Sequence, residues 1–467
     1  MRFWGLLFTI LTIQYNGYSQ DILPKIYLTG DFGNDYQQGT FSIVYVDGTT
    51  EENLTANIKW RGGTTNAEGK HKRNYKIKFA EDHTFFGMRN DNNWILDAGQ
   101  ADVFRLRNRI ATELWNDFAT KPYYINQEPK ALSGVRGQVV EVYLNDEYRG
   151  IYCLTECMDR KQMKLKKYDK DGTIHGVLWK STGYGSSGFS IVPNGYDNSQ
   201  SMMDVFEAKY PEPGEDLPET DYSTLWNAIN FCVNSSNEDF SSYANEYFDI
   251  PVIMDYYLFV NVLSALDNEG KNMYWAAYDQ QNEKKITPAV WDFDRTMGSK
   301  YLDHHYDGLS SPTLGKLNVL NIITRLKENN VDNFNEKVLE RYYSLRKTFF
   351  SNINLINRYK HYYYLLKKSG ASEREEQKWS GDSDINYLPI NYDDEIDYIT
   401  DWINRHMTFV DNEVFPAQTG ITNVTSVNNN TNTILYNLYG QRLLNNYTHK
   451  TGIYIRNGRK YSIRNQK

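Results

Sequence analysis

The spacing of apolar side chains changes once along this chain, and the change limits the folds that it can adopt. Between residues 21 and 160, short segments rich in β-branched and aromatic residues mostly alternate apolar and polar positions, which is typical of β-strands. From Tyr222 onward, apolar residues mostly recur at helical spacing. The pattern predicts an α+β protein with a β-rich first part and a mainly helical second part.

The order of the predicted elements is that of a bilobed protein kinase, with a β-rich N-terminal lobe over 20–160 and a helical C-terminal lobe over 161–415. One helix, over about 101–118, interrupts the strands, and one hairpin, 273–278 with 286–291, interrupts the helices. The predicted strands are 26–29, 40–46, 55–60, 73–79, 138–144 and 148–155. The predicted helices of the second lobe are 222–233, 251–266, 316–327, 331–350, 352–369 and 393–411.

The first residues are typical of a secretory signal peptide. Arg2 precedes an apolar run that ends at Ile13, and the small residues Gly17 and Ser19 follow. The run is shorter than the roughly 20 residues that span a bilayer, and no later segment is longer and uncharged. We therefore expect removal of residues 1–19 and a secreted or surface-displayed protein without an integral membrane segment.

The composition changes again after Pro416. Residues 416–433 are mostly Asn, Thr, Val and Gly, which predicts a linker, and the alternating segments of 434–467 predict a small β-module. The segments 435–442 and 452–460 resemble the C-terminal sorting domain of the type IX secretion system. This resemblance implies the type IX secretion machinery as a partner; a β-module without a sorting role is the alternative.

Charge and cysteine content narrow the possible functions of the 467-residue chain. Its 51 Lys and Arg against 59 Asp and Glu give a net charge of −8, which provides no general attraction to nucleic acid. We therefore expect no nucleic-acid partner. The three cysteines, Cys153, Cys157 and Cys232, are too few for a disulfide framework. Small buried thiols are expected, and a single bridge stays open for an oxidising compartment.

Three polar side chains around the predicted hairpin point to phosphoryl transfer. Asp267 and Asn272 lie just before the first hairpin strand, and Asp292 directly follows the second. Protein kinases place a catalytic Asp, which accepts the proton of the substrate hydroxyl, and two metal-binding residues in this order. A carboxylate and an amide suffice for Mg²⁺, because the nucleotide phosphates supply further oxygens. We predict Asp267 as the base and Asn272 and Asp292 as metal ligands; turn-capping by the same side chains is the alternative.

Further motifs, in the same order, resemble the spore coat protein H (CotH) kinase family over about residues 22–300. The motifs are Arg61-Gly62-Gly63-Thr64-Thr65, the segment 72–79, Asn93-Trp94-Ile95-Leu96, Arg107-Asn108 with Glu113, the segments 141–145 and 148–156, and Asp267, Lys271-Asn272 and Trp291-Asp292-Phe293-Asp294. Members of this family are regarded as atypical protein kinases. The resemblance implies transfer of the γ-phosphoryl group of ATP to Ser or Thr hydroxyls of a protein substrate, with Mg²⁺ or Mn²⁺.

The resemblance also implies a nucleotide site in the first lobe. A lysine of the strand 73–79 would contact the phosphates, and Lys76 and Lys78 share one face of that strand because side chains alternate. We favour Lys76, and a solvated strand position is the alternative for each lysine. Glu113 on the predicted helix would pair with this lysine, and an ordinary exposed helix glutamate is the alternative. Glu156 is grouped with the nucleotide-binding residues.

The phosphate loop departs from that of ordinary kinases. No G-x-G-x-x-G precedes the lysine strand, and Arg61 with the glycines and hydroxyls that follow it stands in this position. Its backbone N–H groups and guanidinium could bind phosphate oxygens, or the segment could be a tight turn. The G-x-G-x-x-G at 183–188 is not followed by a helix pattern, so we interpret it as a flexible loop. A plain surface turn is favoured over a position near the substrate.

Other functions remain as alternatives. The chain has no G-x-S-x-G, H-E-x-x-H or Walker A motif, which argues against the commonest serine hydrolases, zinc proteases and P-loop enzymes. Glycosidases stay open, because their paired carboxylates have no fixed spacing. The main alternative is a non-catalytic cell-surface adhesin, or a module that binds glycans or proteins, on a kinase-like scaffold. Together, Asp267, Asn272 and Asp292 favour the enzyme.

Overall fold

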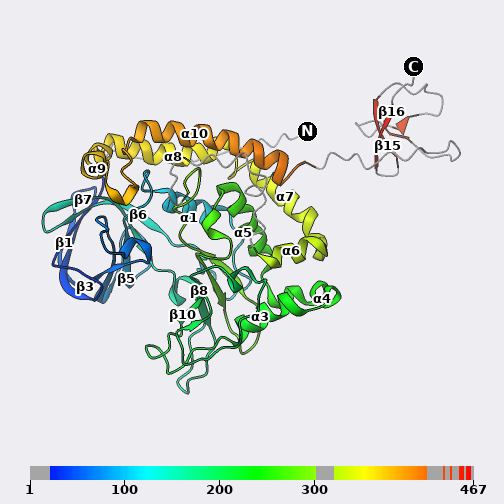
Figure 1. Ribbon diagram of the computed structural model, residues 1–467, viewed down its shortest axis with the longest axis horizontal. Coiled ribbons are helices and arrows are strands. Elements are labelled where there is room, and N and C mark those ends of the chain that lie inside the picture. Colours follow the sequence, from blue (N-terminus) through cyan, green and yellow to red (C-terminus); the bar gives the residue numbers. More distant parts are fainter. Residues whose placement is uncertain are drawn as a thin grey trace, which may run out of the picture. The chain divides into compact units, whose positions relative to one another are not determined.

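The computed structural model describes residues 22–300, 305 and 320–417, and four short strands after residue 434 (Figure 1). The chain divides into two compact units between Val414 and Phe415. The expected signal peptide, most of the expected linker and part of the helix expected at 316–327 lie outside the described residues. No described helix is both long enough and apolar enough to cross a bilayer.

Seven strands of the first unit close into a barrel, drawn in blue to cyan in Figure 1. The strands pair in the order β1-β2-β3-β4-β5-β7-β6, and the parallel pairing of β1 with β6 closes the barrel. Alternation along β4 turns Tyr75, Ile77 and Phe79 into the barrel core and the side chains between them outward. The bounds are β1 Lys25–Thr29, β2 Gln37–Val44, β3 Thr50–Arg61, β4 Asn74–His83, β5 Asp91–Asp97, β6 Gly137–Leu144 and β7 Glu147–Glu156.

Helix α1 (Arg107–Phe118) begins about six residues later than predicted. Asp102 is the reason, because its carboxylate accepts hydrogen bonds from the backbone N–H groups of Phe104 (2.9 Å) and Arg107 (2.8 Å). Such side-chain contacts hold a turn before the helix and compete with helical hydrogen bonds. The side chains of Ile110, Leu114 and Trp115 are buried.

The predicted hairpin is confirmed as β11 (Met273–Ala277) and β12 (Thr287–Val290). It belongs to a five-stranded sheet of order β12-β11-β8-β10-β9. The pairing of β8 with β11 joins segments almost a hundred residues apart, so alternation along the sequence does not reveal it. The other strands are β8 Val177–Ser181, β9 Met202–Met203 and β10 Phe206–Tyr210.

Helices dominate the rest of the first unit, as predicted. Helix α5 is buried along almost its whole length, which fits its nearly uniform apolar sequence. The long helices α8 and α10 pack together, and α9 contacts β7 of the barrel (Figure 1). The bounds are α2 Arg160–Met163, α3 Ser223–Asn234, α4 Asn237–Tyr247, α5 Ile250–Leu263, α6 Asn321–Glu328, α7 Phe334–Arg346, α8 Asn352–Lys368, α9 Ala371–Trp379 and α10 Tyr392–Phe409.

Cys153, Cys157 and Cys232 are all free and buried, as expected, and burial raises the pKa of Cys153 to about 12 and that of Cys157 to about 11.

The second unit contains an antiparallel sheet of order β14-β13-β15-β16. Its strands are β13 Leu435–Tyr436, β14 Arg442–Leu443, β15 Gly452–Arg456 and β16 Arg459–Ile463.

Candidate active site

One cavity, of about 340 Å³, is lined both by the barrel and by the second sheet with its hairpin. The barrel side contributes the loop after β3, Asp97 at the end of β5 and Thr155 on β7. The opposite side contributes polar and charged side chains from β8 and from the segments that flank the hairpin. These are Lys180, Asp267, Lys271, Asp292, Asp294 and Arg295.

Asp267 lies in the short 3-10 helix η3 (Leu266–Asn268), where three donors hold its carboxylate. Oδ2 accepts a hydrogen bond from Asn272 Nδ2 at 2.7 Å, and Oδ1 accepts one from Tyr184 Oη at 2.9 Å. Lys271 Nζ lies 2.9 Å from Oδ1 and 3.1 Å from Oδ2. These donors orient the carboxylate. Because the side chain is still 35% exposed, the carboxylate also remains open to the cavity.

The backbone around Asp292 is tied to helix α1 and to η3. Asn268 Nδ2 donates to the carbonyl of Trp291 at 2.9 Å, which joins the two segments that carry Asp267 and Asp292. Asn108 accepts a hydrogen bond from the N–H of Phe293 (3.0 Å) and donates one to Asp97 Oδ2 (2.8 Å). One residue of α1 therefore fixes both the strand end with Asp97 and the segment that follows Asp292.

Three carboxylates gather in this part of the cavity: Asp97, Asp292 and Asp294. Burial raises the pKa of Asp292, and so do the carboxylates of Asp97 and Asp267, while Lys180 and Arg61 act in the opposite direction. Burial and the Asp292 carboxylate hold the pKa of Asp294 well above its ordinary value. Like charges this close destabilise one another unless a cation lies between them. Carboxylate oxygens are the ligands that Mg²⁺ and Mn²⁺ prefer, so this donor set fits a divalent cation.

Lys180 and Arg61 place positive charge beside these carboxylates. Lys180 projects from β8, and burial lowers its pKa, while the Asp292 carboxylate raises it. Its Nζ lies 5.9 Å from the centroid of the Trp291 ring, and the Arg61 guanidinium carbon lies 5.4 Å from the same ring. The cavity thus combines a carboxylate cluster with cations that could bind phosphate oxygens.

The segment from Arg61 to Thr65 lines the cavity along its whole length, where a phosphate loop is predicted. Gly62 has a φ of +111°, and a Cβ atom there would lie only 2.0 Å from Thr65 Oγ1. Glycine is therefore required at this position, both for the backbone conformation and for space. The sequence pattern located this loop, and the structure brings it to the same cavity as Asp267 and Asp292.

Asn272 does not line the cavity. It donates to Asp267, and its own N–H is bound to the carbonyl of Ser181 at 3.1 Å. In the described residues it supports the carboxylate of Asp267, and its predicted role as a metal ligand stays a prediction.

The two strand lysines and the two glutamates predicted for the nucleotide also lie outside the cavity lining. Lys76 and Lys78 point away from the barrel core because they alternate with its apolar residues. Glu113 does not form the predicted pair with either lysine: its partners are Arg109, at 3.1 Å, and the hydroxyl of Tyr362. Glu156 is fully buried and is bound by Arg136 at 2.6 Å.

Sequence reasoning missed Lys180, Asp97 and Asp294 as site residues. Asp97 directly follows the Asn93-Trp94-Ile95-Leu96 motif, and Asp294 is part of the motif after the hairpin, so both had a local signal. Lys180 lies in an apolar strand, where one lysine among buried neighbours was the available hint. A charged residue in a buried strand is rare unless it is paired.

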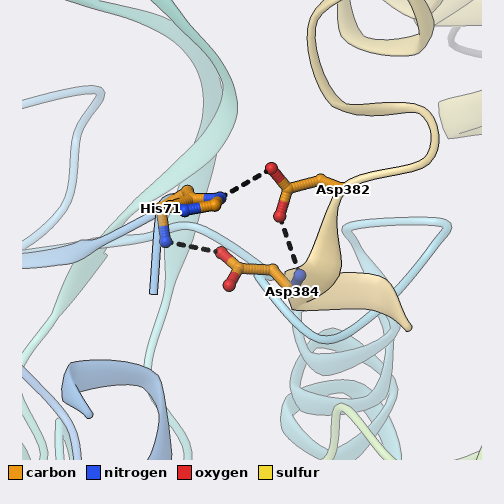
Figure 2. Close-up of side chains that lie close together, drawn as sticks. All are labelled: His71, Asp382 and Asp384. Atoms are coloured by element: carbon orange, nitrogen blue, oxygen red, sulfur yellow. Dashed lines mark hydrogen bonds and ion pairs between the residues drawn. The ribbon is translucent and has the colours of Figure 1, made fainter. Parts of the chain in front are cut away.

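A second group of potential metal ligands is formed by His71, Asp382 and Asp384, of which Asp384 also lines the first cavity (Figure 2). His71 Nδ1 is 2.8 Å from Asp382 Oδ2. Asp384 Oδ2 accepts the backbone N–H groups of His71 (2.9 Å) and Lys72 (2.8 Å). Because these oxygens already have donors, the group acts as a clasp between the start of β4 and the segment after α9.

Comparisons with known proteins complete this description. A search of curated proteins found no match. The sequence model described as CotH kinase protein matches residues 58–410, a span that includes every residue of the cavity lining. Since the match covers well over half of its length, the chain belongs to the CotH kinase family.

Proposed function

We propose that this chain is an exported protein kinase that transfers the γ-phosphoryl group of ATP to Ser or Thr hydroxyls of a protein substrate. The observation that carries the proposal is the presence of Asp267, the carboxylates of Asp97, Asp292 and Asp294, and the cations Arg61 and Lys180 in one cavity. Phosphoryl transfer depends mainly on positioning and on electrostatic stabilisation, and these residue types supply both.

Each group has a defined task in this proposal. Asp267 accepts the proton of the substrate hydroxyl while the hydroxyl oxygen forms a bond to the γ-phosphorus. The bond between the γ-phosphorus and the β–γ bridging oxygen breaks, and ADP leaves. Lys271, bound to the same carboxylate, provides positive charge next to the transferred group. Arg61, Lys180 and the N–H groups of the loop after β3 bind phosphate oxygens.

The carboxylates Asp292, Asp294 and Asp97 would hold Mg²⁺ or Mn²⁺. When bound, the cation would offset the negative charge of the phosphate oxygens. The crowding of three acidic groups, two of them with raised pKa values, is the structural support for this assignment. Asn108 keeps Asp97 in place for this task through its hydrogen bond of 2.8 Å.

Phosphotransfer assays test the proposal directly. The mature protein is incubated with labelled ATP, Mg²⁺ or Mn²⁺ and dephosphorylated casein as acceptor, alongside Asp267→Asn and Asp292→Asn. Asp401→Asn, on the exposed side of α10, is the matched control. We expect labelled Ser or Thr with wild type and control, and at least about a hundredfold less with either site variant. Equal label in all four proteins, or label in none, would contradict the proposal.

Export is supported by the sequence alone. The pattern of residues 1–19 and the resemblance of the C-terminal segments to type IX sorting domains both favour it. Fractionation of cells that produce the full chain, or the chain without residues 434–467, provides the test. Loss of surface or extracellular protein on truncation is the expected result, and unchanged export contradicts a sorting role.

A further inference from the structure

A second cavity, of about 660 Å³, has an unusual concentration of positive charge. Six of its nine lining residues are Lys or Arg, and none is acidic. The cations are Arg89, Lys130, Arg136, Arg160, Lys161 and Lys164. In a chain with a net charge of −8, such a local excess is not the effect of overall composition.

Carboxylates that do not themselves line this cavity hold some of its cations in place. Asp159 binds the Arg89 guanidinium with contacts of 2.7 and 2.6 Å, and Glu156 binds Arg136 at 2.6 Å. Asp91 contacts both Arg89 (2.6 Å) and Lys161 (3.0 Å). These three carboxylates offset three of the six cations and hold the guanidinium groups in place.

The other three cations keep their charge for a ligand. Among the described residues, Lys130, Lys164 and Arg160 have no carboxylate partner. Arg160 donates to the carbonyl of Leu165 at 3.1 Å and lies over the ring of Tyr210, so its position is defined while its charge is not neutralised. The cavity therefore carries an excess of about three positive charges at neutral pH.

The basic cavity lies next to the candidate active site. Val135 and Thr155 line the first cavity, whereas their neighbours Arg136 and Glu156 form an ion pair at the second. The backbone N–H of Glu156 also donates to the Arg136 carbonyl at 3.1 Å. The two cavities are therefore lined by neighbouring residues of the chain, so they lie close together in the first unit.

We propose that the basic cavity docks an acidic segment of the protein that the kinase phosphorylates. Naming that protein as the substrate rests on the function proposed above, whereas the binding itself does not require phosphoryl transfer. The N–H donors of the Arg160 guanidinium and the ammonium groups of Lys130 and Lys164 suit the carboxylates of Asp and Glu side chains.

A nucleic acid fits this surface less well. Binding of single strands combines a basic groove with aromatic side chains on which bases stack, and no aromatic residue lines this cavity. The negative net charge of the chain also disfavours a long polyanion, because repulsion from the rest of the surface adds up along its length. A short acidic peptide segment avoids this cost.

Binding of an oligoglutamate peptide tests the inference. Fluorescence anisotropy of the labelled peptide is measured on the mature full chain without ATP or metal, with an oligoglutamine peptide of equal length and a single-stranded oligonucleotide as competitors. The variant Lys130→Glu/Lys164→Glu changes the cavity. The control, Lys347→Glu/Lys368→Glu, alters two exposed lysines outside it and changes the net charge equally.

We expect the cavity variant to bind oligoglutamate at least about tenfold more weakly than wild type, and the control to bind within about twofold. Unfolding temperatures of both variants should match wild type, since the substituted side chains are on the surface. Equal weakening in both double variants, competition by oligoglutamine, or preferred binding of the oligonucleotide would each overturn the inference.

A second readout separates this inference from the kinase proposal. Asp267→Asn should bind oligoglutamate as wild type does, even if neither wild type nor any variant transfers phosphate. If transfer is observed, the cavity variant should raise KM for an acidic protein acceptor about tenfold while kcat remains unchanged. A lower kcat with unchanged KM would contradict docking.

Discussion

Tyr184 Oη donates a hydrogen bond of 2.9 Å to Oδ1 of Asp267, so the loop 183–188 contacts the carboxylate that we propose as the catalytic base. The loop also packs tightly against the segment after η3: a Cβ atom on Gly270 would lie 2.8 Å from the carbonyl oxygen of Ser187. Tyr184 is nevertheless 55% exposed. The glycine-rich loop is therefore part of the candidate active site and is accessible to a protein substrate.

Removal of this hydroxyl should slow transfer. In Tyr184→Phe the ring stays and the bond to Asp267 is lost, which should lower kcat about three- to tenfold because the base is less well oriented. Steady-state kinetics with saturating ATP measure the change. Tyr364→Phe, on an equally exposed tyrosine of α8, is the control and should leave kcat unchanged. A Tyr184→Phe enzyme with wild-type kcat would show that the bond has no catalytic role.

Lys180 should be needed for nucleotide binding. Lys180→Met retains the length and apolar part of the side chain. It removes the cation that most strongly lowers the pKa of Asp292, and with it a positive charge from the proposed phosphate site. We expect kcat/KM for ATP to fall about a hundredfold, the scale of losing one preorganised charge in a buried site. Lys209→Met on β10, whose lysine pairs with Glu207, is the control. Unchanged kcat/KM in Lys180→Met would exclude the proposed contact of Lys180 with phosphate.

The loop after β3 provides a matched pair of variants. Gly62→Ala places a Cβ 2.0 Å from Thr65 Oγ1 at a φ of +111°, whereas Gly63→Ala meets no atom within 4 Å at a φ of −82°. We expect Gly62→Ala to raise the Kd for ATP about tenfold or more and Gly63→Ala to change it little, as measured by calorimetry. The same effect in both variants would show that this loop shape is not required for ATP.

Glu375 on α9 should be essential for stability. Its buried carboxylate binds Lys72 Nζ and Arg105 Nε, each at 2.7 Å, and accepts the N–H of Ile151. Glu375→Gln removes the charge and leaves two buried cations without compensation, so the free energy of unfolding should fall by about 3 to 5 kcal/mol. Urea denaturation measures this loss. The exposed Glu373→Gln on the same helix serves as control, and similar stabilities of both variants would contradict the assignment.

His406 should make stability depend on pH. Burial lowers its pKa to about 4, although Nε2 donates to the Asn261 carbonyl at 2.9 Å. The unfolded chain, with a histidine pKa of about 6.5, binds more protons below this pH than the folded chain does. The free energy of unfolding should therefore fall as the pH drops from about 6.5 towards 4, by about 2 to 3 kcal/mol from this group.

The test compares pH slopes rather than absolute stabilities. His406→Gln has no titratable group at this position, so its unfolding free energy should lose about 2 to 3 kcal/mol less than that of wild type between about pH 7 and pH 4. The exposed His361→Gln should retain the wild-type slope. If both variants follow wild type, burial of His406 does not produce the pH dependence.

Local patterns in the sequence were sufficient for much of this protein. Alternation identified the barrel strand that carries Tyr75, Ile77 and Phe79, and helical spacing identified α8 and α10, because both periods report directly which face of an element is buried. Helix α9 escaped this logic. Its buried face carries Glu375 in an ion-pair network rather than an apolar stripe, so hydrophobic periodicity had little to detect.

The sequence by itself determined which short segments carry the side chains proposed for the site: the loop from Arg61 to Thr65, Asp267 before the hairpin and Asp292 after it. Only the tertiary structure decided which of these side chains share a cavity. It places Lys180 and Asp97, from strands of two different sheets, in the cavity lining and leaves Lys76 and Glu113 outside it. The physical reason is that alternation predicts whether a side chain points into the core or away from it. It does not predict which residues that side chain contacts. That depends on pairings such as β8 with β11, between residues distant in the chain.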